Sequence, residues 1–136
     1  MVRKIFYKSI LLFIFLTSFF SCQRISVPEP SLNVLFGEWK FQSASGGFTG
    51  DGPGWSQSRG IRINFKKSGT VIRSEAGRVV QTENFKFVQK TSIFSDDISY
   101  QLDYPQSIDQ SFSIKGDTLL LQDEVHDGFS YTYTRK

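Results

Sequence analysis

Cysteine and histidine are almost absent from this chain, which has one of each among its 136 residues. A single cysteine cannot form a disulfide within the chain, so the hydrophobic core must hold the fold alone. His126, the only histidine, lies among the carboxylates of residues 123–128, a stretch typical of a solvated turn. Because most structural metal sites use several His or Cys ligands, we predict no metal site; a metal at His126 is the weaker alternative.

The chain also lacks a phosphate-binding loop. Residues 45–56 contain five glycines and Pro53, a composition that excludes helix and strand. No Gly-Lys-Ser/Thr sequence follows and no strand-to-helix transition surrounds the glycines, so a nucleotide phosphate is not the expected ligand. Loops of this length within small domains are typically functional or mobile.

The chain has no excess of charge of either sign once the first 21 residues are set aside. Arg3, Lys4 and Lys8 account for three of the 16 basic residues, and the basic residues that remain equal the 13 acidic ones in number. The sequence pI of about 9.1 therefore comes mostly from the leader. This balance gives no indication of a nucleic-acid partner.

Residues 1–21 have the features of a signal peptide. A basic start is followed by an almost unbroken apolar run over residues 10–20, and small Ser21 precedes Cys22. The apolar run is too short to span a bilayer comfortably, which makes a transmembrane helix the weaker alternative.

Ser18-Phe-Phe-Ser-Cys22 resembles the lipobox of bacterial lipoproteins, although Phe19 and Phe20 stand where a Leu and a small residue are more usual. The resemblance implies cleavage before Cys22 and anchoring by two or three fatty acyl chains, such as palmitate. Ordinary secretion with an unmodified thiol is the alternative. We predict a tether over residues 22–31. Because neither residue after Cys22 is acidic, we also predict attachment to the outer membrane, facing the periplasm.

Groups suited to catalysis are few. Lipid on Cys22 removes the only thiol as a nucleophile. The carboxylates of Asp96, Asp97 and Asp103 fit turn and exposed strand positions. We therefore predict no catalytic residue, no cofactor and no enzymatic activity.

Residues 32–136 predict an all-β domain with tight turns and no helix. Eight strands are expected, at residues 37–41, 61–66, 70–73, 78–90, 98–104, 112–114, 119–121 and 129–136. The run over 78–90 does not keep one phase, so a bulge is expected there. Eight sequential antiparallel strands favour an up-and-down barrel. An immunoglobulin-like sandwich is the alternative, which lacks the usual cysteine and tryptophan pattern.

The first and last of these strands both alternate apolar and polar residues with period 2. Gly37, Trp39 and Phe41 share one face of the first strand, and Arg135 shares a face with the aromatic residues of the last. A closed sheet pairs these two strands, which would place the Arg135 guanidinium over the Trp39 indole. We interpret Gly37, Trp39 and Arg135 as framework that closes the barrel.

Gly37-Glu38-Trp39 on the first strand, with Arg135 on the last, resembles the pattern of the lipocalins. The layout over residues 32–136 is similar to short lipocalin-like lipoproteins of bacteria. The chain is shorter than a typical lipocalin and lacks the late helix and the cysteine pairs that many members carry. The resemblance implies a barrel that holds a small ligand, with a lid in the loop after the first strand.

We predict that large aromatic side chains contribute to such a ligand site. The candidates are Phe48 and Trp55 as gate residues of the loop, and Phe65, Phe85, Phe87, Tyr100, Phe112, Tyr131 and Tyr133 in the interior. The alternative is that these rings simply fill the barrel. Glu83 is expected to face inward with Arg73 as its partner, either holding a polar ligand head or, preferably, forming a satisfied core pair.

Two functions remain open. The preferred one is a membrane-anchored protein that binds a small apolar or amphipathic ligand in the bacterial cell envelope. The alternative is an envelope interaction or inhibitor protein whose barrel is filled by side chains and whose loops or outer face bind a partner.

Overall fold

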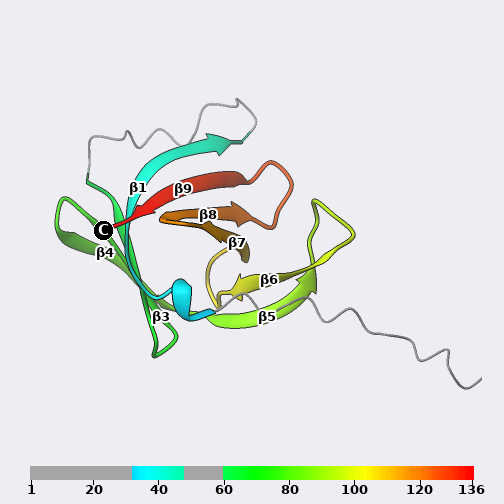
Figure 1. Ribbon diagram of the computed structural model, residues 1–136, viewed down its shortest axis with the longest axis horizontal. Helices are drawn as coiled ribbons and strands as arrows, with labels where there is room; N and C mark the ends of the chain where they lie inside the picture. Colours follow the sequence, from blue (N-terminus) through cyan, green and yellow to red (C-terminus); the bar gives the residue numbers. More distant parts are fainter. Residues whose placement is uncertain (1–31, 48–59) are drawn as a thin grey trace, which may run out of the picture. The chain divides into compact units, whose positions relative to one another are not determined.

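The computed structural model describes residues 32–47 and 60–136, which fold into one curled antiparallel sheet (Figure 1). The expectations for the signal peptide, Cys22, Phe48 and Trp55 lie outside these residues. Within the described ranges, no helix combines the length and the hydropathy that a membrane span requires.

The described chain forms nine strands after one short 3-10 helix. These are η1 (Leu32–Val34), β1 (Gly37–Gly46), β2 (Arg62–Lys66), β3 (Thr70–Glu75), β4 (Arg78–Asn84), β5 (Lys86–Thr91), β6 (Ile98–Asp103), β7 (Gln110–Lys115), β8 (Thr118–Asp123) and β9 (Phe129–Arg135). Their order in the sheet is β4-β3-β2-β1-β9-β8-β7-β6-β5. The expectation of an all-β fold is confirmed. The strands form a single curled sheet, a half-barrel, and not the two separate layers of the alternative sandwich.

The predicted count of eight strands is wrong, because the expected strand over residues 78–90 is divided at Phe85. Phe85 alone separates β4 from β5, and these strands form the two opposite edges of the sheet. Its N–H leaves the ladder to bond the Gly69 carbonyl at 2.8 Å, while its ring is buried. The run therefore bends there, pairing with β3 before the bend and with β6 after it.

The bulge expected in this run is confirmed within β4. Arg73 lies opposite Gln81 while the next residue of β3, Ser74, lies opposite Val79. Val80 is therefore the extra residue, and both valines are exposed at the edge of the sheet. A bulge of this kind increases local twist and turns an edge strand away from regular pairing.

The predicted pairing of the first and last strands is confirmed. β1 lies beside β9 in the sheet (Figure 1). In this ladder Trp39 lies directly opposite Arg135, and Phe41 opposite Tyr133. The Arg135 guanidinium carbon lies 4.1 Å from the centroid of the Trp39 ring. This cation–π contact stabilises the junction between the first and last strands of the sheet-forming domain.

The segment before β1 covers this junction. Leu35 is fully buried, and its carbonyl accepts a 2.8 Å hydrogen bond from the indole Nε1–H of Trp39. The Arg135 guanidinium donates to the carbonyls of Phe36, at 3.3 Å, and Val34. The 3-10 turn and the two strands are thus held together by one tryptophan and one arginine.

The core lies on the inward face of the sheet, near this junction. Its largest fully buried side chains are Trp39, Phe65, Leu35, Ile63, Leu102, Leu119, Leu121 and Val71. Burial of a side chain of this size contributes about 1.5–3 kcal/mol relative to exposure. Farther along the same inward face, the strands carry polar side chains instead.

Candidate functional site

A cavity of about 490 Å³ lies where the inward face becomes polar. Its apolar wall is formed by Ile61, Val80, Ile108 and Leu121. Its polar wall includes Arg73, Glu75, Gln81, Ser107, Gln110, Asp123, Tyr131 and Tyr133. The cavity therefore offers both hydrogen-bonding groups and apolar surface.

Strand alternation explains why these side chains face inward. On β8, Leu119 and Leu121 are buried in the core, and Asp123 continues the same phase two residues later. On β9, Tyr133 and Tyr131 lie opposite Leu119 and Leu121. The same two strands thus build the core at one end and the cavity wall at the other.

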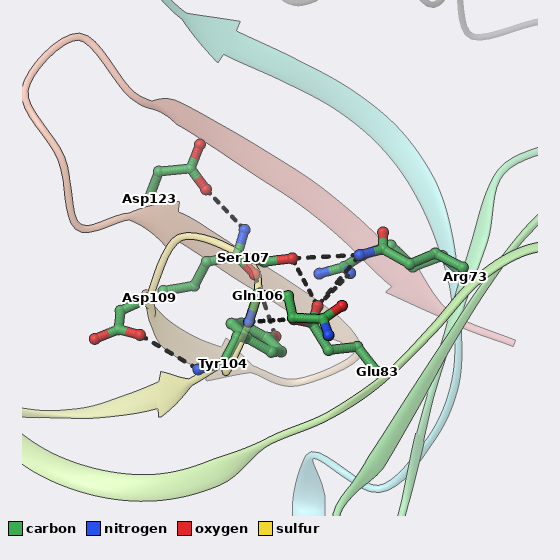
Figure 2. Close-up of polar contacts among 9 residues, drawn as sticks. Arg73, Glu83, Tyr104, Gln106, Ser107, Asp109 and Asp123 are labelled. Atoms are coloured by element: carbon green, nitrogen blue, oxygen red, sulfur yellow. Dashed lines mark hydrogen bonds and ion pairs between the residues drawn. The ribbon is translucent and has the colours of Figure 1, made fainter.

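Glu83 is the centre of one buried polar cluster in the site (Figure 2). Its carboxylate accepts hydrogen bonds from the Ser107 hydroxyl at 2.6 Å, the Gln106 N–H at 3.0 Å and the Gln81 amide at 3.2 Å. Arg73 lies 3.7 Å away, with its guanidinium over the ring of Tyr104 at 5.5 Å. The predicted inward Glu83–Arg73 pair is confirmed, as part of a larger cluster.

This cluster joins the edge strand β4 to the loop between β6 and β7. Besides Glu83, Gln81 contributes a bond from its amide to the Ser107 hydroxyl at 3.3 Å. The loop is also held from its other end, because Asp109 accepts hydrogen bonds from Lys90 and from the Tyr104 N–H. Burial acts to raise the pKa of Asp109, but these bonds outweigh it and the pKa is lowered.

Asp123 is the centre of a second buried cluster, on the opposite wall. Its carboxylate accepts hydrogen bonds from the Gln110 amide at 2.8 Å, the Phe129 N–H at 3.1 Å and the Tyr131 hydroxyl at 3.3 Å. The Gln110 carbonyl oxygen in turn accepts a bond from the Tyr104 hydroxyl at 3.3 Å. Figure 2 shows Asp123 together with the Glu83 cluster.

The hydroxyl groups of the three tyrosines at the site have raised pKa values, which favour the protonated, neutral form. Burial raises the pKa of Tyr133 to about 12, because phenolate is poorly solvated in the interior. Burial also raises the pKa of Tyr131, and the Asp123 carboxylate adds to the effect. Burial raises the pKa of Tyr104 against the opposing charge of Arg73. All three hydroxyls therefore remain hydrogen-bond donors at neutral pH.

Most of the predicted interior aromatic residues belong either to the core or to the cavity wall. Phe65 and Phe85 are buried in the core, with Phe87 packed against them; successive ring centroids are 5.5 Å and 5.4 Å apart in edge-to-face geometry. Tyr131 and Tyr133 line the cavity. Tyr100 is only partly buried and is not part of the cavity wall.

Sequence reasoning missed most of the polar wall. Gln81, Gln110 and Ser107 carry no motif that marks them, and their convergence depends on long-range pairing. Asp123 was interpreted as part of a solvated turn, which is wrong, because it is only 5% exposed. The period-2 pattern of Leu119 and Leu121 is the signal that would have placed it inward.

Among residues 32–47 and 60–136, no group of three or more His, Cys, Asp or Glu side chains is arranged to hold a metal ion. His126 lies exposed in the loop between β8 and β9.

No protein-family model, no curated protein and no solved structure matches this chain.

Proposed function

We propose that this chain is a lipocalin-like, non-enzymatic binding protein of the bacterial cell envelope, whose interior holds one small amphipathic molecule. The observation that carries the proposal is the cavity of about 490 Å³. Small-molecule sites in proteins are generally concave and span roughly 300–1,000 Å³. The mixture of apolar and hydrogen-bonding walls favours a ligand with both characters over a wholly apolar one.

In this function the curled sheet is the container that surrounds the ligand. Its two edges, β4 and β5, are continuous through Phe85, and side chains of the β6–β7 loop bond to the β4 edge at Glu83. The pairing of Trp39 with Arg135 supports the resemblance to lipocalins. A sheet of this size has an interior just wide enough for side chains or one small ligand.

The proposed location follows from the predicted leader and lipid. Cys22 would carry acyl chains that anchor the domain to the outer membrane, on its periplasmic face. Metabolic labelling with a palmitate analogue tests the anchor: the wild-type chain is expected to incorporate label, and Cys22→Ala is not. Labelling of both chains alike, or of neither, would contradict it.

An interaction protein remains the second candidate, because one tip of the sheet is apolar. Ile93, Phe94 and Ile98, at and beside the turn between β5 and β6, are 43%, 51% and 60% exposed. Exposed apolar side chains gathered on one hairpin are typical of a contact surface. In this second function the cavity would be incidental, and the hairpin would bind the partner.

A matched pair of valines tests the binding function. Val80 lines the cavity and Val79, its neighbour on β4, does not, yet both are exposed. Amphipathic molecules with phenylalkyl bodies are titrated into the purified full chain by calorimetry, with empty detergent micelles as the blank. Val80→Trp is expected to weaken binding about tenfold or more, since the indole would fill part of the cavity, and Val79→Trp is not.

Absence of binding by every compound tested, in the wild-type chain, would overturn the ligand-binding proposal. Equal binding by wild type and Val80→Trp would place the bound molecule outside this cavity. In either outcome the apolar hairpin becomes the preferred functional surface.

A further inference from the structure

The charges around the cavity are unequal. Arg73 is its one inward-facing cation among the described residues, and that guanidinium is already paired with Glu83 at 3.7 Å. Arg62, at the rim, bonds Glu38 at 3.0 Å on the outer face. Asp123, a further carboxylate of the wall, leaves the interior of the cavity with an excess of negative charge among the described residues.

Asp123 carries this negative charge into the interior. It is 5% exposed, and within residues 32–47 and 60–136 it forms no ion pair. Its three hydrogen-bond donors, an amide of Gln110, the N–H of Phe129 and the hydroxyl of Tyr131, are all neutral. They orient the carboxylate without neutralising it, whereas buried carboxylates are usually paired with a cation.

The carboxylate also retains capacity for another donor. An ionised carboxylate has about four lone-pair positions, and the three bonds above leave one, on the oxygen that faces Gln110. Tyr131 and Tyr133 line the same cavity, and the face of an aromatic ring attracts a nearby cation.

We propose that the molecule bound in this cavity carries a cationic nitrogen, an amine or a related ammonium group, which pairs with Asp123 between Tyr131 and Tyr133. The apolar part of the ligand lies against Leu121, Ile61 and Val80. This inference rests on the proposed function, since it assigns the head group of the same ligand.

Three compounds with one body and different head groups test the proposal. 4-Phenylbutylamine, 4-phenylbutanol and 4-phenylbutyrate are titrated into the full chain at neutral pH by calorimetry. The amine is expected to bind about tenfold or more tightly than the alcohol, and the carboxylate most weakly, because a hydrogen-bonded charge pair is formed only with the amine.

Asp123→Asn is the matching variant, because the amide keeps the size of the side chain and removes its charge. It is expected to weaken binding of the amine about tenfold or more and to change binding of the alcohol less than about threefold. Asp96→Asn, which removes an exposed carboxylate away from the cavity, serves as the control and is expected to bind all three compounds as the wild type does.

The outcomes separate the two proposals. Equal affinity for the amine and the alcohol in the wild-type chain, or tighter binding of the carboxylate, would overturn the cationic head group and leave the binding function standing. Undiminished binding of the amine by Asp123→Asn would overturn it as well. If none of the compounds binds, both proposals fail. Should the variant not fold, the ranking in the wild-type chain decides.

Discussion

Arg135 combines three contacts that are individually modest. Its guanidinium covers the Trp39 ring at 4.1 Å and donates to two carbonyls of the segment before β1. A lysine in its place would keep the charge but lose the planar group that makes these contacts simultaneously. The residue thus acts as a structural clamp between the two ends of the chain.

Arg135→Ala is expected to lower the free energy of unfolding by about 2–4 kcal/mol, through loss of the cation–π contact and the charged hydrogen bonds. Arg135→Lys should fall between this variant and the wild type. Urea denaturation followed by tryptophan emission measures the effect. Lys136→Ala is the control: its ion pair with Glu38 is on the surface, so a loss below about 1 kcal/mol is expected.

Tyr133 makes stability depend on pH in the alkaline range. Its pKa is raised from 10.0 to about 12 by burial, so below pH 10 both folded and unfolded chains keep the proton. Between the two values the unfolded chain releases the proton and the folded chain retains it, which favours unfolding. Stability is therefore fully present below pH 10 and is lost as the pH rises toward 12.

This contribution is expected to reach about 2–3 kcal/mol at the upper end of the range. Tyr133→Phe should remove it, so that the variant loses less stability than the wild type between about pH 8 and about pH 11.5 in urea denaturation. An identical decline in both proteins would show that Tyr133 does not titrate on unfolding in this range.

At the scale of elements, the edge strand β4 is held by side chains on the edge where no strand pairs with it. The β6–β7 loop bonds to it at Glu83 through the Gln106 N–H and the Ser107 hydroxyl. Arg73 completes the cluster from β3. The loop is thereby fastened to the edge strand at Glu83 without pairing to it as a further strand, while Val79 and Val80 stay exposed.

Glu83→Ala is expected to destabilise the protein by about 2–4 kcal/mol, because Arg73 loses its partner and the loop loses its acceptor. The amide of Gln106 should also lose protection in hydrogen exchange, which a general loss of stability alone would spread over the whole sheet. Thr82→Ala, an exposed neighbour on β4, is the control and is expected to cost less than about 1 kcal/mol. Unchanged protection at Gln106 in Glu83→Ala would contradict this role.

The sequence predicted the strands themselves better than the places where the chain bends or where distant strands come together. Alternation was sufficient to turn Glu83 inward, because a period of two leaves only two faces. Together with the expectation that a closed sheet pairs its first and last strands, it also placed Arg135 near Trp39. It was not sufficient to divide the long run at Phe85, since that bend depends on a hydrogen bond to Gly69, a residue of another turn. The cavity wall depends on pairings between distant strands, and no local pattern encodes those.

Asp123 illustrates the same difficulty within the candidate site. Asp127-Gly128, which follows it, is a strong turn signal. For this reason Asp123 was predicted to lie in a solvent-exposed turn. The strand continues to Asp123 before the loop begins, so the inward phase of Leu121 determines its position. A polar residue at the end of a strand can face either the protein interior or solvent, depending on the residues that surround it in space.

At the scale of the whole molecule, the sheet consists of two sequential meanders. One contains β1 to β4, the other β5 to β9, and within the sheet the β1–β9 ladder is the only pairing that joins them. The chain itself joins them again at Phe85. The last strand is therefore central in the sheet, although it is terminal in the sequence.

Removal of residues 129–136 is expected to abolish cooperative unfolding, because β1 and β8 would both lose a partner and the meanders would separate. Circular dichroism during heating, with size-exclusion chromatography, measures the result. Removal of Lys136 alone should leave one cooperative transition. A cooperative transition in the longer deletion would show that one meander folds independently.

The position of β9 also has a consequence in time. The first strand is made long before the last strand, and β1 has β2 as its sole hydrogen-bonded neighbour in the sheet until β9 is present. The sheet can be completed only after synthesis ends, through a contact that spans almost the entire described chain. Until β9 is present, one edge of β1 therefore has no hydrogen-bonded partner in the sheet, and the addition of β9 completes it.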